Sequence, residues 1–525
     1  MSPAVRRSLA VVLLLAVAAA ALVAVTPSLA LIRFGGGRHQ SNPSWLWQTH
    51  VYTAPPPVRS KPPRRPAPHR TRRRPYEPPV AHAAAPAAAA APRPETEPSP
   101  TPEPGPRRTG IHKIRHVVIV MQENRSFDEY FGTYPGADGI PAGTCVPDPA
   151  GGPCVAPYHD SSLVDYGGPH TAAAAHADIR GGAMDGFVGQ AENGRRSCRG
   201  PNEPYCAPPG SPVDVMGYHD AREIPNYWAY ARRFVLQDHM FEPNFGWSLP
   251  AYLWMVSGWS ARCLNPSLPM TCHTDLVDPG TPNGGESRYA WTDITYLLHQ
   301  HRVSWGYYVS SGDVPDCASG QVTCHRRPLN AGTPSIWNPL PRFTTVRLDG
   351  ELAHVRPSGR FFAQAGSGTL PAVSWIVPNE RDSEHPPASI RNGQAWVTRI
   401  VNSVMRGPDW RSSAIFVAWD DWGGFYDHVN PPAVDAFGYG LRVPGLMISP
   451  YARRGMVDHQ TLSFDAYLRF IEDDFLGGSR LDPATDGRPD ARPAVRETAP
   501  ELGDLAAEFD FNRRPRRPVL LPLYP

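Results

Sequence analysis

Two adjacent carboxylates, Asp420 and Asp421, directly follow a short apolar run from Ala414 to Trp419. The run is rich in residues that favour β-structure and predicts a fully buried strand. The glycine pair Gly423 and Gly424 then turns the chain at once. Like charges at the end of a buried strand repel each other and are costly to remove from water, and a bound divalent cation would offset both costs. A solvated polar turn is the alternative interpretation of this stretch taken alone.

A second predicted strand, His116 to Met121, delivers oxygen-bearing side chains in a similar way. Glu123 and Asn124 come just after it. Ligands of open α/β sheets bind beyond the carboxyl ends of the strands. Together with the acidic pair above, these residues would supply four hard oxygen donors, which suit a divalent cation. Arg125 follows, and either holds a phosphate oxygen or forms a structural ion pair.

Apolar runs and segments with helical periodicity alternate through the rest of this region. A strand, a helix and a second strand in succession form the βαβ unit of a parallel sheet. The pattern therefore predicts an α/β fold with a mostly parallel central sheet. Strands are expected at 234–239, 303–309, 373–377 and 443–448, and helices at 292–301, 393–405 and 464–475.

Ser248 opens an apolar stretch that continues to Trp259 and predicts a helix. Pro250 fits only the first turn of such a helix, so Ser248 lies close to the N-cap. A hydroxyl at that position faces the positive end of the helix dipole, which favours an alkoxide and a bound phosphate. The alternative is that Ser248 only caps the helix.

The N-terminal part of the chain indicates export. Arg6 and Arg7 precede an uncharged apolar stretch, so residues 1–34 are predicted to be either a signal peptide or an N-terminal membrane anchor. Both place the bulk of the protein outside the cytoplasm. Residues 35–110 are rich in Pro, Ala and Arg, which predicts a disordered linker. Its basic residues either contact a membrane or wall polymer or are solvated, and no interleaved aromatic residues suggest nucleic-acid binding.

The folded region is predicted to span residues 111–477, followed by a Pro-rich C-terminal tail at 478–525 with little core. The eight cysteines form four pairs that are close in the sequence. An even number in an exported chain indicates disulfides, and proximity favours four small loops. No CxxC pair occurs, so a zinc–thiolate site is not expected. The expected bridges are Cys145–Cys154, Cys198–Cys206, Cys263–Cys272 and Cys317–Cys324.

Six sequence blocks resemble, in the same order, those of the bacterial phosphoesterase family that contains phospholipases C and certain acid phosphatases. The plant non-specific phospholipases C share them. The blocks are HVVIVMQENRSFDEYFG at 116–132, GGAMDGF at 181–187, PNFGWSLPAY at 243–252, SEHPP at 383–387, WDDWGGFYDHVNPP at 419–432 and GLRVPGLMISP at 440–450.

The resemblance implies an alkaline-phosphatase-like fold, a three-layer α/β sandwich with disulfide-bearing loops. It implies Ser248 as the nucleophile, where the plant enzymes carry Thr. His385 and His428 match histidines that line the family's active site, and His170 corresponds to a third. The implied metal ligands are Glu123, Asn124, Asp420 and Asp421, with Ser248 beside them.

These features predict an exported, metal-dependent phosphoric ester hydrolase, either a phospholipase C or an acid phosphatase, acting on phospholipid or on small phosphate esters. Ser248 would attack phosphorus and form a phospho-serine, and His385 or His428 would protonate the leaving alcohol. Oxygen ligands fit Ca²⁺, Mg²⁺ or Mn²⁺, and a nearby histidine would admit Zn²⁺ or Fe. The alternative is a non-catalytic surface protein, tethered by its linker, that binds phospholipid or wall polymer.

Several aromatic residues near the expected site either contact lipid or belong to the core. They are Trp247, Tyr252, Trp254, Trp259, Trp422, Phe425 and Tyr426.

Overall fold

The computed structural model describes residues 109–196, 207, 213–280, 288–315 and 326–525. The predicted signal or anchor at 1–34, nearly all of the linker at 35–110, and the expected bridges Cys198–Cys206 and Cys317–Cys324 lie outside these residues. Within them, no helix is both long and apolar enough to span a membrane.

An eight-stranded sheet forms the centre of the molecule, in the order β10-β7-β11-β1-β12-β13-β4-β14. Among these strands only β13 runs antiparallel to its neighbours, and all the other pairings are parallel. Buried apolar side chains on both faces of the central strands account for their near-continuous hydrophobic sequences. The bounds are β1 His116–Gln122, β4 Val235–Gln237, β7 Trp305–Val309, β10 Val355–Pro357, β11 Val373–Val377, β12 Ser413–Trp419, β13 Gly445–Ile448 and β14 Met456–Asp458.

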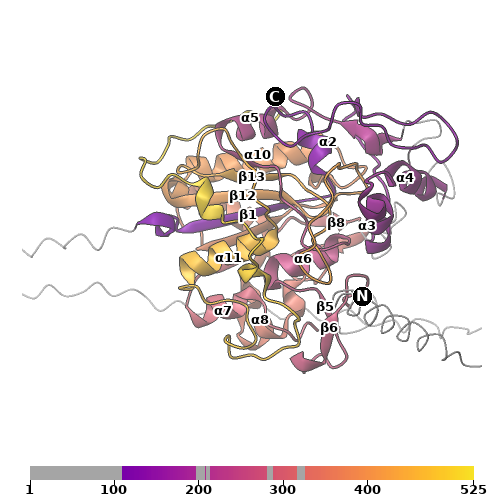
Figure 1. The fold of residues 1–525 in the computed structure, drawn as a ribbon. Coiled ribbons are helices and arrows are strands. Elements are labelled where there is room, and N and C mark those ends of the chain that lie inside the picture. Colours follow the sequence, from indigo (N-terminus) through magenta and orange to yellow (C-terminus); the bar gives the residue numbers. More distant parts are fainter. Residues whose placement is uncertain (1–108, 197–206, 208–212, 281–287, 316–325) are drawn as a thin grey trace, which may run out of the picture. The chain divides into compact units, whose positions relative to one another are not determined.

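Helices cover both faces of this sheet (Figure 1). On one face lie α5 (Pro225–Arg233) and α10 (Ile390–Arg406), and on the other α6 (Ser248–Ser257), α7 (Ile294–Gln300), α8 (Thr344–Leu348) and α11 (Phe464–Phe475). The residues of α10 with helical periodicity, from Trp396 to Val404, are its buried positions. The predicted three-layer α/β arrangement with a mostly parallel sheet is therefore confirmed.

Shorter elements surround this frame. The remaining helices are α2 Phe127–Phe131, α3 Ala172–Ile179, α4 Phe187–Arg196 and α9 Ser358–Ser367, and the remaining strands are β2 Tyr158–His159, β3 Gly217–Tyr218, β5 Ala261–Cys263, β6 Cys272–Thr274, β8 Gly312–Val314 and β9 Arg327–Leu329. The predicted disulfides Cys145–Cys154 and Cys263–Cys272 are present and close two of the surface loops.

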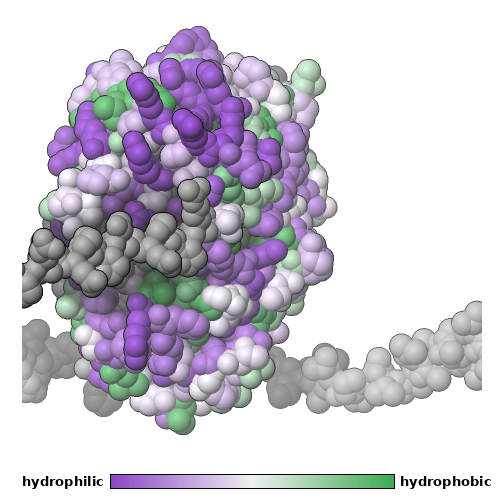
Figure 2. All heavy atoms as spheres, turned by 90° about the vertical axis from the view of Figure 1, so that its left-hand side faces the viewer, coloured by the Kyte–Doolittle hydropathy of each residue, from purple (hydrophilic) through white to green (hydrophobic). Residues whose placement is uncertain are grey.

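The register between β1 and β12 positions the candidate site. The two strands are parallel, and all seven residues of β1 pair with β12, from His116 opposite Ser413 to Gln122 opposite Trp419. Both strands therefore end at the same edge of the sheet, and Glu123 follows one strand end where Asp420 follows the other. The opposite end of the molecule, where β1 begins, has a largely hydrophilic surface (Figure 2).

The C-terminal segment 478–525 was expected to add little to the core, and this expectation was wrong. Leu481, Leu502, Leu505 and Phe509 are buried in the main hydrophobic core. The Phe509 ring stacks on Phe470 of α11 with 5.5 Å between ring centroids. Farther along, backbone carbonyls of the segment accept hydrogen bonds from side chains of α5 and α10. The average composition of the segment is Pro-rich and polar, so it did not indicate that single, widely spaced apolar residues pack into the core.

We expect Phe509→Ala to destabilise the fold by about 3–5 kcal/mol, because it empties a buried aromatic site. Phe509 is 3% exposed, whereas Leu520 in the same segment is 46% exposed. Leu520→Ala is therefore the matched control, with an expected change within about 0.5 kcal/mol. Urea unfolding of both variants measures the difference. Equal stability of the two would contradict the observed packing of the segment.

Candidate active site

Four of the predicted metal ligands meet at the ends of β1 and β12. The backbone N–H of Asn124 donates to Asp420 Oδ1 at 3.0 Å, and its side-chain Nδ2 donates to Asp421 Oδ1 at 2.9 Å. Burial, followed by the charges of Glu123 and Asp420, raises the pKa of Tyr252 well above its usual range, so both carboxylates lie near this hydroxyl. The side chains of Glu123, Asn124, Asp420 and Asp421 are fully buried. Because the two strands are in parallel register, residues almost 300 positions apart in the sequence form one acidic cluster.

The backbone around this cluster is specialised. Asn124 has φ 54°, in the left-handed region, which asparagine tolerates better than most residues. Gly423 has φ 62°, and a Cβ at this position would lie 2.8 Å from the Asn124 Cβ. Its N–H donates to Asp421 Oδ1 at 2.8 Å. The Gly-Gly turn is therefore needed both for its conformation and for its close approach to Asn124.

Ser248 is the first residue of α6 and joins this cluster. Its Oγ donates to Glu123 Oε2 at 3.1 Å, and the Tyr252 hydroxyl, one turn later, donates to Glu123 Oε1. The helix N-cap is Trp247, which makes no side-chain capping bond. Ser248 therefore does not act as the cap, and its hydroxyl points to the acidic cluster.

The residues present fit a divalent cation. Three carboxylates, an amide and a hydroxyl provide hard oxygen donors, the set that Ca²⁺, Mg²⁺ and Mn²⁺ prefer. The buried Asn124 Oδ1 accepts no hydrogen bond within the described part of the chain. Several buried carboxylates so close together require compensating positive charge.

His170 and His385 face each other beside the cluster, with their ring centroids 5.9 Å apart. His385 follows Ser383, whose carbonyl accepts the Glu123 N–H at 3.1 Å. His170 follows Gly168, whose N–H donates to the carbonyl of Gly423 at 2.9 Å. Backbone hydrogen bonds thus join the segment of each histidine to a residue of the cluster or of its turn.

The Nδ1 atoms of both rings contact backbone carbonyls. His170 Nδ1 lies 3.0 Å from Gly168 O, and His385 Nδ1 lies 2.9 Å from Pro386 O. A carbonyl only accepts, so Nδ1 carries the hydrogen in each ring.

Glu384 anchors the loop that carries His385, a role that the sequence did not suggest. Its fully buried carboxylate accepts hydrogen bonds from the Tyr130 hydroxyl at 2.7 Å, the Tyr227 hydroxyl at 2.5 Å and Trp419 Nε1 at 3.0 Å. Burial raises its pKa, although Arg125 and these donors oppose the shift. Only the motif SEHPP, in which Glu384 precedes the histidine, could have drawn attention to it.

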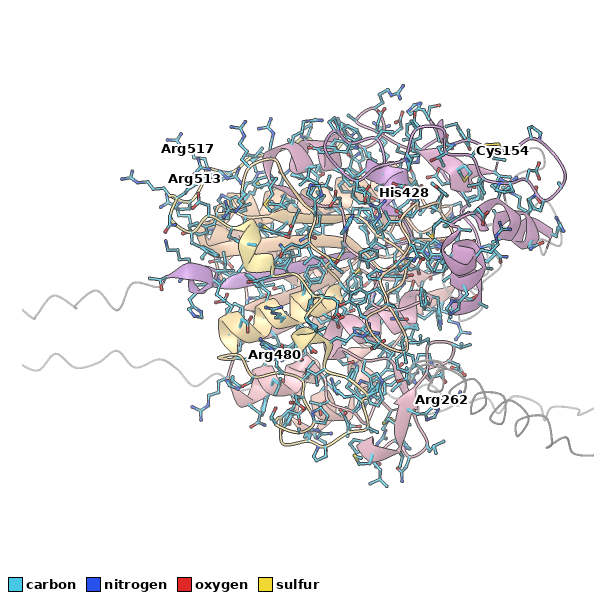
Figure 3. All side chains as sticks on the ribbon, in the orientation of Figure 1. Cys154, Arg262, His428, Arg480, Arg513 and Arg517 are labelled. Carbon is cyan, nitrogen blue, oxygen red and sulfur yellow. A yellow bond between two sulfur atoms is a disulfide. The ribbon has the colours of Figure 1, made fainter. Side chains whose placement is uncertain are left out.

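His428, labelled in Figure 3, lies in a different hydrogen-bond network. Its Nδ1 lies 2.7 Å from Asp128 Oδ2, and its Nε2 lies 3.3 Å from Asp138 Oδ1. Burial alone would lower the pKa of His428, but the hydrogen bond to Asp128 and the charge of that carboxylate raise it. None of the hydrogen bonds of His428 within the described residues is to Ser248 or to the acidic cluster.

Asp427, next to His428, belongs to the same network. It accepts a 2.8 Å hydrogen bond from Arg442 Nε, and Arg442 Nη2 also lies 3.0 Å from Asp128 Oδ1. Burial raises the pKa of Asp427 to about 6, although Arg442 opposes the shift. Asp128, Asp427 and His428 bring ligand atoms close enough together to hold a metal ion, but the Arg442 guanidinium already balances their charge.

The sequence left two roles open for Arg125, binding of a phosphate oxygen and a structural ion pair. The structure shows the ion pair. Its guanidinium is fully buried and lies 3.3 Å from Glu129 and 3.2 Å from Asp165. Its Nη1 donates to the carbonyl of Asn124 at 2.6 Å. Arg125 therefore supports the left-handed backbone at Asn124.

Glu242 and Asn244, just before Ser248, are further residues that sequence reasoning missed. Burial, followed by the charges of Asp421 and Asp420, raises the pKa of Glu242 well above its usual range. Its Oε2 and both side-chain polar atoms of Asn244 have no hydrogen-bond partner among the residues that the structure describes. Their only sequence signal was their proximity to the serine block.

The aromatic residues near the site belong to the core. All seven are at most 7% exposed, and Trp422 Nε1 donates to the buried Asp178 carboxylate at 3.0 Å. Of the two alternatives for these side chains, the structure shows core packing.

The serine and the acidic cluster at the carboxyl edge of the sheet offer a nucleophile beside candidate ligands for a divalent cation. The model of the phosphoesterase family matches residues 114–476, and the chain belongs to this family of phosphoric ester hydrolases.

Curated relatives agree with this assignment. Phospholipase C A of Mycobacterium tuberculosis is 28% identical over 78% of this chain and 80% of its own length. A non-hemolytic phospholipase C of Pseudomonas aeruginosa is 27% identical over 70% of this chain and 55% of its own length. Non-specific phospholipase C6 of Arabidopsis thaliana is 25% identical over 66% of this chain and 63% of its own length.

Among solved structures, an alkaline phosphatase superfamily protein from Vibrio parahaemolyticus is 10% identical, with 74% of this chain and 73% of that chain covered and a TM-score of 0.31. So low a score adds nothing to the family assignment.

Proposed function

We propose that this phosphoesterase is an exported, metal-dependent phospholipase C that acts through a phospho-serine at Ser248. The hydrogen bond from Ser248 Oγ to Glu123, within one buried cluster with Asn124, Asp420 and Asp421, is the observation that carries the proposal. Bacterial and plant relatives named phospholipase C favour a phospholipid substrate. Export is inferred from residues 1–34, which lie outside the described residues.

Ser248 performs the nucleophilic step. Its hydroxyl proton passes to Glu123 as the oxygen attacks phosphorus, the bond from phosphorus to the diacylglycerol oxygen breaks, and the phosphorylated head group remains on the serine. Water then cleaves the phospho-serine, the serine oxygen regains a proton, and the phosphorylated head group is released. The hydrogen bond to Glu123 orients the hydroxyl, and the N-terminus of α6 offers backbone N–H groups and positive dipole potential to the phosphoryl oxygens.

Glu123, Asn124, Asp420 and Asp421, with the Ser248 oxygen beside them, would hold the divalent cation. When bound, such a cation supplies positive charge that stabilises the serine oxygen and the phosphoryl oxygens. The Asn124 N–H and side-chain amide meanwhile keep Asp420 and Asp421 in fixed orientations.

His385 and His170 are the groups proposed to protonate the leaving alcohol. Each holds its Nδ1 hydrogen against a backbone carbonyl, which leaves Nε2 as the exchanging atom. His428 was an equal candidate by sequence. Its two ring nitrogens contact Asp128 and Asp138, so its proposed role is to fix the turn after the acidic pair.

Two rival functions differ in what they predict. An acid phosphatase would cleave soluble monoesters and leave phospholipids intact. A non-catalytic surface protein would cleave neither, and the joint presence of Ser248 and the complete acidic cluster argues against it.

We expect Ser248→Ala to lower the rate of ester hydrolysis by at least about a thousandfold, because the nucleophile is removed. Ser161→Ala, on the exposed surface, is the matched control with unchanged rate. Release of head group from phosphatidylcholine and of chromophore from a phosphate monoester is measured for both. If wild type and Ser248→Ala are equally inert with Ca²⁺, Mg²⁺, Mn²⁺ and Zn²⁺, the enzyme proposal fails. Cleavage of the monoester alone identifies a phosphatase.

The location of the metal is tested by replacing one carboxylate of the acidic cluster and, separately, one carboxylate of the network around His428 and Arg442. Asp421→Asn is expected to lose most of the divalent metal that copurifies with the wild type, because a charged ligand is removed. Asp128→Asn, in the network of His428 and Arg442, is expected to retain it. Metal content is measured by mass spectrometry on variants whose folding is checked by circular dichroism. Loss of metal in Asp128→Asn with retention in Asp421→Asn would transfer the site to the other network.

The proton donor is identified by the dependence of the rate on the leaving group. Removal of a general acid slows esters of alkyl alcohols far more than esters of nitrophenol, whose anion leaves without a proton. We expect His385→Asn to slow the alkyl ester at least about a hundredfold more than the nitrophenyl ester. His428→Asn is expected to affect both esters equally. The opposite pattern would assign the proton to His428.

A further inference from the structure

The hairpin of β5 and β6 exposes aliphatic side chains at its tip and base. The two strands pair antiparallel, and the Cys263–Cys272 disulfide closes the eight-residue loop between them. Leu264 is 82% exposed, Leu268 52%, Met270 63% and Val277 63%. Isolated exposed apolar residues are ordinary on a protein surface, whereas a contiguous exposed apolar patch marks an interaction site.

This hairpin, residues 261–278, is connected directly to the helix that carries Ser248. Trp247, the residue before Ser248, donates from Nε1 to the carbonyl of Val277 at 3.2 Å. At the other end of α6, Trp259 Nε1 donates to Thr274 Oγ1 at 2.9 Å. The base of the hairpin is therefore hydrogen-bonded to the residues that flank α6, the helix that carries Ser248.

The chemistry of the hairpin fits a lipid surface better than a protein partner. It contains no Trp, Tyr or Phe, whereas protein interfaces are usually centred on Trp, Tyr and Arg anchors. Its one arginine, Arg262, is in an ion pair of 3.1 Å with Asp278. Pro266 and Pro269 lack backbone N–H groups, which reduces the number of polar groups that must leave water at the tip.

Charge selects the kind of lipid. The hairpin carries Arg262 against Asp275 and Asp278, and the Asp275 carboxylate accepts the backbone N–H groups of residues 277 and 278 at 2.9 and 2.8 Å. No cationic excess is present to attract an anionic membrane. A zwitterionic bilayer is the surface that such a hairpin enters without electrostatic cost.

We propose that the β5–β6 hairpin docks this enzyme on zwitterionic phospholipid bilayers through Leu264, Leu268, Met270 and Val277. The inference rests on the proposed phospholipase function, since docking serves a lipid substrate. Figure 1 shows the hairpin projecting from the body of the domain, and Figure 3 labels Arg262 within it. Insertion of the aliphatic side chains positions the α6 N-terminus at the surface that contains the ester.

The test measures partitioning of the full chain onto phosphatidylcholine vesicles. Ser248→Ala is present in every protein so that the vesicles stay intact. Adding Leu264→Ser and Met270→Ser is expected to weaken partitioning roughly a hundredfold, about tenfold for each side chain. The matched control adds Leu520→Ser, an exposed leucine of the C-terminal segment, and keeps wild-type partitioning. Partitioning should also be insensitive to salt, unlike binding through the basic linker.

Equal partitioning of the hairpin variant and the control would overturn the proposal, as would no partitioning of the parent protein. A hairpin variant that changes the oligomeric state and leaves vesicle binding intact would overturn it in favour of self-association. A second measurement separates the docking proposal from the proposed phospholipase function. It is the hydrolysis of a short-chain, water-soluble phosphodiester by the protein with Ser248 intact. If this ester is cleaved without vesicle binding, only the docking surface fails. If vesicles bind through the hairpin and no ester is cleaved, only the phospholipase proposal fails.

Discussion

The parallel pairing of β1 with β12 is the interaction on which the candidate site depends. It places Glu123 and Asn124 beside Asp420 and Asp421, at a point where the sheet is buried on both faces. A shift of the register by one residue would exchange the two faces of a strand and separate these side chains. The dense apolar packing along both strands therefore fixes the register, and the register in turn fixes the site.

Two buried arginines stabilise the polar segments around this edge. Arg125 holds the Asn124 carbonyl and is balanced by Glu129 and Asp165, while Arg442 is balanced by Asp128 and Asp427. Removal of one partner from such a pair leaves an uncompensated buried charge, which costs about 3–5 kcal/mol. In the cluster of Glu123, Asp420 and Asp421, amide and hydroxyl groups donate hydrogen bonds to the carboxylates. The donors are Asn124, Gly423, Ser248 and Tyr252.

The strands and the long helices were predictable because their periodicity is local. The strand at 373–377 and the helix at 464–475 have the predicted bounds. Two acidic strand ends and a serine at a helix start also indicated the site from sequence, since each motif follows directly on its own element. The predicted pairings of Cys145 with Cys154 and of Cys263 with Cys272 hold for the same reason: the partners are close in the chain.

Sequence by itself thus determined the α/β class, the principal strands and the residues from which the acidic cluster is built. Only the tertiary structure decided how polar residues outside the strands are partnered. It joined His428 to Asp128, turned Arg125 inward, buried the aromatic residues and packed the C-terminal segment against α11. It also showed that Leu264, Leu268, Met270 and Val277 of the β5–β6 hairpin are exposed. These contacts join residues that are far apart in the chain. They follow from packing in three dimensions, which local composition and periodicity do not predict.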